Sequence, residues 1–208
     1  MFGGNFQTWK LHSAQDYFMF FAYILAGVMV FWLIAKHMNK QRNHEKAVEK
    51  VSGRLKKICG KPGEVLKNAT LNLPEGKMTF DAVLMDKRGV YLVRTYGWGI
   101  KIYGTPDGAM WRREDAKRKE EFENPLLNLK KGAEEIGKIM EENGVHNLKV
   151  MPMVVFADNY QTPELYLGYG SYSTTYQELK SWYKKQSGVK EVQYDYDKVS
   201  SIIKGLVK

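Results

Sequence analysis

The first hydrophobic pattern in the chain is a stretch of apolar residues, 17–35, that contains no charged side chain. As a helix it would be about 28 Å long, which is close to the ~30 Å hydrocarbon core of a bilayer. A buried helix of a soluble protein would need apolar neighbours on every side, and a domain of this size rarely encloses one. A cleavable signal sequence has a shorter apolar region that ends at a small-x-small site, whereas this run ends at Lys36 without such a site. We therefore predict one uncleaved transmembrane helix.

The next pattern, in residues 43–59, has period 3.6 rather than continuous hydrophobicity. Apolar side chains recur three and four positions apart at Ala47, Val48, Val51, Leu55 and Ile58. This spacing predicts an amphipathic helix that leads out of the membrane segment, and glycine and proline residues at 60–63 end it.

Short extended segments with turn residues between them follow. The segments 68–73 and 78–85 flank a Pro-Glu-Gly-Lys turn and predict a hairpin. The segments 90–97, 99–104 and 109–113 are separated by turn-forming residues and complete a predicted meander. The charged stretch 113–123 is expected to be a solvated connection or the end of a helix.

The second half of the chain alternates between helical and extended patterns. Asn124 can cap a helix with Pro125 at its first position, and an apolar stripe continues to Met140 before Gly144 ends the pattern. The run 148–157 is almost entirely apolar, as expected of a strand that is covered on both faces.

A short strand at 165–169 and amphipathic helices near 174–186 and 196–206 are predicted at the end of the chain. The whole order predicts an α/β fold, with a mixed sheet flanked by helices and one transmembrane helix before it.

Charge adds an orientation to this picture. The net charge is +9, and residues 36–57 carry eight lysines and arginines against two glutamates, whereas the residues before the span are roughly balanced. Basic flanks stay on the cytoplasmic side, so we predict a single-pass protein of the cell membrane with its N-terminus outside and its C-terminal domain in the cytoplasm. The side chains expected to face lipid headgroups are Lys36, Lys40, Arg42 and Lys46. Approach of nucleic acid to the same basic run is the alternative.

These patterns divide the chain into four predicted parts. They are an N-terminal segment outside the cytoplasm (1–16), the transmembrane helix (17–35), a basic juxtamembrane helix (36–59) and an α/β domain (60–208). The single cysteine, Cys59, excludes an intramolecular disulfide and a cysteine-based metal cluster.

Several short motifs of the α/β part occur in an order that matches a known family. They are Gly63-Glu64, the strand FDAVLM at 80–85, the glycine-led strand at 89–93, the turn ending at 102–104, Trp111, Asn124-Pro125 and the strand VMPMVVFA at 150–157. Over residues 60–180 the chain resembles the nuclease-related domain (NERD) proteins. The resemblance implies a restriction-endonuclease-like fold with a PD-(D/E)xK active site.

The resemblance also implies a site chemistry. In the family an Asp and a Glu hold Mg²⁺, and a Lys two residues after the Glu lies on the same face of its strand. Asp81 matches the first carboxylate, and Glu64 matches an accessory acid on the preceding helix. Arg94 stands at the position of the Glu, Tyr96 at that of the Lys, and Asn128 at that of a helical Gln. The usual metal-dependent site is therefore predicted to be degenerate.

A guanidinium cannot ligate a cation, so Arg94 is predicted to pair with Asp81 in the place of the metal. We expect no resident cofactor and no catalytic residue, and a binding or scaffolding function at the cytoplasmic face of the membrane. One alternative is an active nuclease in which Glu64 and Asp81 hold Mg²⁺ and Lys101 replaces the lost lysine. Another is a structural membrane subunit that only contacts other proteins. The expected partners are the membrane and either a nucleic acid or a protein.

Overall fold

The computed structural model describes residues 14–41, 43–97, 99–116, 118–158, 161–186 and 194–207. The chain separates into two compact units, Met1–Lys40 and Gln41–Lys208. Of the predicted sites and segments, residues 1–13 and the side chains of Lys40 and Arg42 lie outside the described part.

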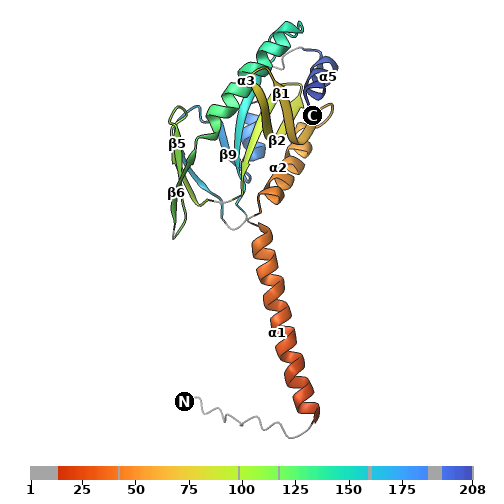
Figure 1. Cartoon of the computed structure of the whole chain (residues 1–208), viewed down its shortest axis with the longest axis vertical. Coiled ribbons are helices and arrows are strands. Elements are labelled where there is room, and N and C mark those ends of the chain that lie inside the picture. Colours follow the sequence, from red (N-terminus) through yellow and green to blue (C-terminus); the bar gives the residue numbers. More distant parts are fainter. Residues whose placement is uncertain are drawn as a thin grey trace. The chain divides into compact units, whose positions relative to one another are not determined.

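The first unit consists of helix α1, Ala14–Gln41 (Figure 1). Its part from Ala14 to Lys36 is long and apolar enough to cross a membrane, and no residue in the most apolar stretch of this part is buried. Near its end the ammonium group of Lys36 lies 4.5 Å from the centre of the Trp32 ring. An apolar helix is thus present at 17–35, as the sequence predicts, and it continues beyond the apolar run at both ends.

The second unit is built around a five-stranded sheet with the order β1-β2-β3-β7-β9. Its strands are β1 (Glu64–Leu73), β2 (Gly76–Asp86), β3 (Gly89–Tyr96), β7 (Val150–Phe156) and β9 (Ser173–Thr175). The hairpins β1–β2 and β2–β3 are antiparallel, and β3–β7 and β7–β9 are parallel. The predicted mixed sheet is therefore confirmed.

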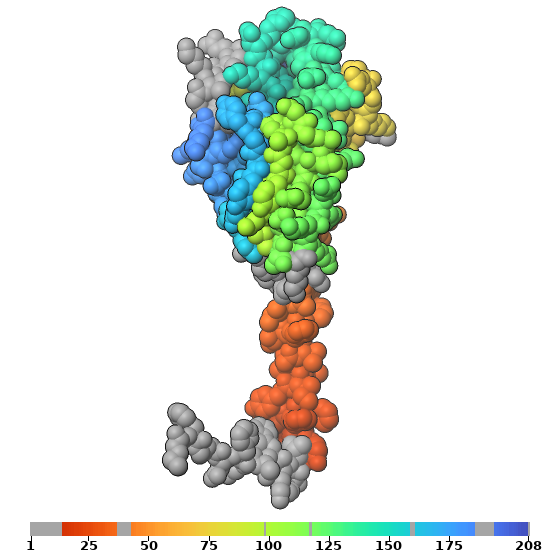
Figure 2. All heavy atoms as spheres, turned by 90° about the vertical axis from the view of Figure 1, so that its left-hand side faces the viewer, coloured from red at the N-terminus to blue at the C-terminus, as the bar shows by residue number. Residues whose placement is uncertain are grey.

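A second, four-stranded sheet has the order β6-β5-β4-β8. Its strands are β4 (Lys101–Gly104), β5 (Met110–Glu114), β6 (Lys119–Glu123) and β8 (Glu164–Leu167), and they lie together on the face shown in Figure 2. The expectation of a solvated connection or helix end at 113–123 was wrong, because β6 pairs with β5 along its whole length. Phe122 packs against the Trp111 ring opposite it on β5 and against Tyr96 of β3, and Arg113 pairs with Glu120 at 2.9 Å.

Helices cover both faces of the larger sheet. Helix α3 (Pro125–Glu142) and helix α5 (Tyr196–Leu206) pack on one face, and α2 (His44–Cys59) and α4 (Leu179–Gln186) pack on the other. The predicted cap of α3 is confirmed, since the Asn124 side chain accepts a hydrogen bond from the backbone of Leu126.

Helix α2, which the apolar spacing predicts, packs on the larger sheet of the second unit. Ala47, Val51 and Leu55 are buried against Leu84 and Val93 of the sheet. The helix predicted from 174 begins only at Leu179, because residues 173–175 pair with β7.

Candidate functional site

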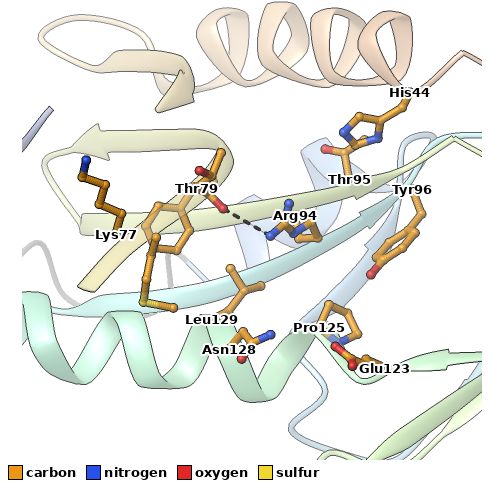
Figure 3. Close-up of a pocket in the computed structure, with 12 residues that line it drawn as sticks. His44, Lys77, Thr79, Arg94, Thr95, Tyr96, Glu123, Pro125, Asn128 and Leu129 are labelled. Atoms are coloured by element: carbon orange, nitrogen blue, oxygen red, sulfur yellow. Dashed lines mark hydrogen bonds between the residues drawn. The ribbon is translucent and has the colours of Figure 1, made fainter. Parts of the chain in front are cut away.

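The site lies where strands β2 and β3 separate. Their ladder ends at Ala82 and Val93; beyond it, residues 76–80 pair only with β1 and residues 94–96 only with β7. The opening forms a pocket of about 430 Å³ between these strand segments, the start of α3 and the start of α2 (Figure 3).

Asp81 lies at the inner end of this opening, and its side chain is only 5% exposed. One oxygen, Oδ2, accepts a hydrogen bond of 2.6 Å from the backbone N–H of Thr95. The other, Oδ1, lies 3.3 Å from Nη1 of Arg94 and 3.3 Å from Nε2 of His44. Both oxygens of the buried carboxylate therefore already have partners.

Arg94 connects the two strands where their backbone ladder stops. Its Nη1 donates to Asp81, and its Nη2 donates to the backbone oxygen of Thr79 at 3.2 Å (Figure 3). Its side chain is 35% exposed, so the guanidinium also contributes to the wall of the pocket. The predicted pairing of Arg94 with Asp81 is thus present in the structure.

Tyr96 and Asn128 both line the same pocket. The Tyr96 ring stacks on Phe156 at 5.6 Å and packs against Phe122 at 5.1 Å. Burial raises the pKa of the Tyr96 phenol, so this side chain stays neutral rather than anionic at physiological pH. A phenol also cannot supply the positive charge of the lysine that it replaces. Asn128 is exposed on the first turns of α3.

The structure places Glu64 elsewhere, and its predicted position on a helix was wrong. Glu64 is the first residue of β1, opposite Met85, and its carboxylate contacts Nζ of Lys204 at 2.8 Å and the hydroxyl of Ser200 at 3.4 Å. The residue of β1 beside Asp81 is Asn68, which lies about 13 Å further along the strand at ordinary strand rise. Glu64 and Asp81 therefore do not form a joint carboxylate site.

Lys101, the candidate for a relocated lysine, is in the second sheet. Its ammonium group lies 3.9 Å from Glu164, and it does not line the pocket.

Three charged or titratable pocket residues were missed by the sequence analysis, namely His44, Lys77 and Glu123. Lys77 was assigned to a turn and Glu123 to a solvated connection. His44 could have been found, because the resemblance places a polar group on the helix before the sheet and His44 begins that helix.

Comparison with known proteins assigns the chain to a family. A model of the nuclease-related domain, NERD, matches residues 40–157, which is more than half of the chain. The chain belongs to the NERD family. The NERD match includes α2, the strands from β1 to β7 and helix α3, and thus every element that borders the pocket.

One curated relative is an uncharacterized protein of Bacillus anthracis, 30% identical over 112 residues. The aligned region is 53% of this chain and 52% of the relative, so the chain spans about half the length of that protein. No solved structure matches the chain.

The residues around Asp81 do not fit the Mg²⁺ that the NERD family implies. Mg²⁺ requires oxygen ligands in near-octahedral geometry, usually from one or two carboxylates and water. Here Oδ1 of Asp81 lies beside a guanidinium, which is permanently positive and has no lone pair to offer. Within the described residues, no group of three or more His, Cys, Asp or Glu side chains is placed to hold a metal ion.

Proposed function

We propose that this chain is a membrane-anchored NERD protein that binds its partner at the cytoplasmic membrane face without cleaving it. The observation that carries the proposal is the contact between Arg94 and the buried carboxylate of Asp81. A divalent cation at Asp81 would have to displace the guanidinium or tolerate its charge a few ångströms away, and both are costly at a buried position.

The proposed binding site is the pocket beside this ion pair. Arg94, Lys77 and His44 bring positively charged or protonatable groups to it, against the carboxylate of Glu123, while Phe80 and Leu129 supply apolar wall. Arginine has five N–H donors, and two of those of Arg94 are accounted for by Asp81 and Thr79. This arrangement favours an anionic group with an apolar body, and we propose a nucleic-acid phosphate with its attached nucleoside.

The proposed anchor is the apolar part of α1, with the cell membrane as its location. Two features support a single span with the domain in the cytoplasm. The helix is apolar around its circumference and unburied, and basic residues predominate on its C-terminal side.

The absence of cleavage is tested directly with the full chain in lipid nanodiscs. We expect no Mg²⁺- or Mn²⁺-dependent hydrolysis of single- or double-stranded DNA or RNA above the level of the matched Asp81→Asn protein. Product formation would be followed on end-labelled oligonucleotides. Cleavage that needs the metal and disappears in Asp81→Asn would show an active nuclease and overturn the proposal.

Binding is tested by the affinity of the same preparation for labelled oligonucleotides at several salt concentrations. Lys77→Ala is expected to weaken binding about three- to tenfold and to lower the salt dependence by about one phosphate contact. The control is Lys138→Ala, an exposed lysine on α3 that does not line the pocket. If neither the unaltered chain nor the Lys138→Ala protein binds DNA or RNA at low salt, a protein partner replaces nucleic acid as the proposed ligand.

A further inference from the structure

We infer that the outer surface of α2 and α4 is a docking surface for anionic phospholipid headgroups. This inference goes beyond the pocket, and it rests on the proposed membrane anchorage. In this arrangement α1 tethers the domain, and the α2/α4 surface fixes how the domain lies on the bilayer.

The two helices form one continuous surface. Both pack on the same face of the larger sheet, through Leu55 of α2 and through Leu179 and Tyr183 of α4. They also meet at Tyr176, just before α4. The ammonium group of Lys50 and the guanidinium of Arg54 each lie 4.5 Å from the centre of its ring.

This surface is rich in exposed lysine and poor in acid. Its exposed lysines are Lys46, Lys50, Lys56 and Lys57 of α2 and Lys180, Lys184 and Lys185 of α4. The exposed acids on or next to these helices are Glu45, Glu49 and Glu178. Lys46, Lys57 and Lys185 form no ion pair with any carboxylate in the described part of the chain.

The second sheet provides an internal comparison. Its basic side chains are neutralised locally, because Lys101, Arg112, Arg113 and Lys119 each lie within 4 Å of a glutamate. The positive charge on α2 and α4 is therefore more available to an external partner than the positive charge on the second sheet. Trp182, which is half-buried in α4, adds a side chain type that is favoured at membrane interfaces.

The chain connection favours a lipid surface over any other anionic partner. The apolar span ends at Lys36 and α2 begins at His44. The residues between them, 37–43, can extend at most about 25 Å. Helix α2 therefore stays within reach of the headgroup layer, where the tether makes the local concentration of lipid very high. Near such a surface each lysine or arginine shifts the equilibrium by about fivefold.

The test uses the full chain in nanodiscs of phosphatidylcholine alone or with phosphatidylserine. Lysine acetylation rates would be measured site by site by mass spectrometry. We expect the lysines of α2 and α4 to react at least threefold more slowly in the anionic nanodiscs, with the difference lost in high salt. Lys138 on α3 should react equally in both.

A charge-reversed pair gives the matched comparison. Lys57→Glu with Lys185→Glu should abolish the protection of the remaining α2 and α4 lysines. Lys130→Glu with Lys138→Glu changes the net charge equally but lies on α3, and should leave the protection intact. Equal acetylation in neutral and anionic nanodiscs would overturn the inference. Protection by added oligonucleotide but not by phosphatidylserine would also overturn it and would assign the surface to nucleic acid.

Anchorage has its own readout, which is retention of the chain in membranes at alkaline pH. Release into the soluble fraction would contradict the proposed anchor, whereas equal acetylation in neutral and anionic nanodiscs of a chain that is retained in membranes would overturn only the α2/α4 inference.

Discussion

Replacement of Arg94 by alanine is expected to lower the free energy of unfolding by about 2–3 kcal/mol. The change removes the guanidinium from a carboxylate that is 5% exposed, and it also removes the donor to the Thr79 carbonyl. This loss is smaller than that expected for a fully buried ion pair, because the Arg94 side chain is 35% exposed and Asp81 keeps its hydrogen bond from the Thr95 N–H. Urea denaturation at neutral pH would measure it.

A double-mutant cycle separates the pair from its surroundings. Asp81→Asn removes the charge that Arg94 compensates, so the combined Arg94→Ala and Asp81→Asn protein should lose at least about 1 kcal/mol less than the sum of the two single changes. Arg112→Ala is the surface control, since the Arg112 side chain is 48% exposed and Glu114 keeps Lys119 as a partner; its loss should stay below about 1 kcal/mol. Additive single losses at positions 81 and 94 would show that the ion pair does not stabilise this site.

Replacement of Arg94 by glutamate is expected to create a divalent-cation site beside Asp81. The new carboxylate would stand opposite Asp81 at the open end of the β2–β3 ladder, where the family places its Glu. Without metal two adjacent carboxylates repel each other, so the protein should be less stable than the parent. Mn²⁺ should then raise its free energy of unfolding by about 2.7 kcal/mol at a hundredfold excess over the dissociation constant.

The control for this gain is Arg94→Gln. It removes the same positive charge and has nearly the same shape, but it supplies no second carboxylate. A Mn²⁺-dependent stabilisation of the glutamate protein that the glutamine protein does not show would assign the gain to the paired carboxylates. Equal stabilisation of both would place the bound cation elsewhere.

Much of the fold follows from local sequence patterns. The β1–β2 and β2–β3 hairpins have alternating or apolar strands between turn residues, and α3 has Asn124 as a cap before Pro125. The contact of Arg94 with Asp81 was also predictable, because two opposite charges at facing positions of an antiparallel pair lie within reach of each other. Each of these features depends on residues that are close in the sequence, or on the register of one pair of neighbouring strands.

The errors concern positions that tertiary contacts determine. Strand β6 has the sequence KEEFE, which has almost no apolar side chain, and it becomes a strand because Phe122 packs against the Trp111 ring. Glu64 was placed on a helix by the resemblance to the NERD family, but the helix before the sheet starts 20 residues earlier, at His44. Lys77 and Glu123 become pocket residues only through the separation of β2 from β3, which no local pattern indicates.

We propose that Arg94 occupies the place of the metal at Asp81. The decisive measurement is Mn²⁺ binding to the unaltered chain, followed by electron paramagnetic resonance and compared with the Asp81→Asn protein. We expect equal binding by the two proteins, and one additional Mn²⁺ site in Arg94→Glu. A Mn²⁺ site in the unaltered chain that is lost in Asp81→Asn would show that the carboxylate of Asp81 still holds a metal.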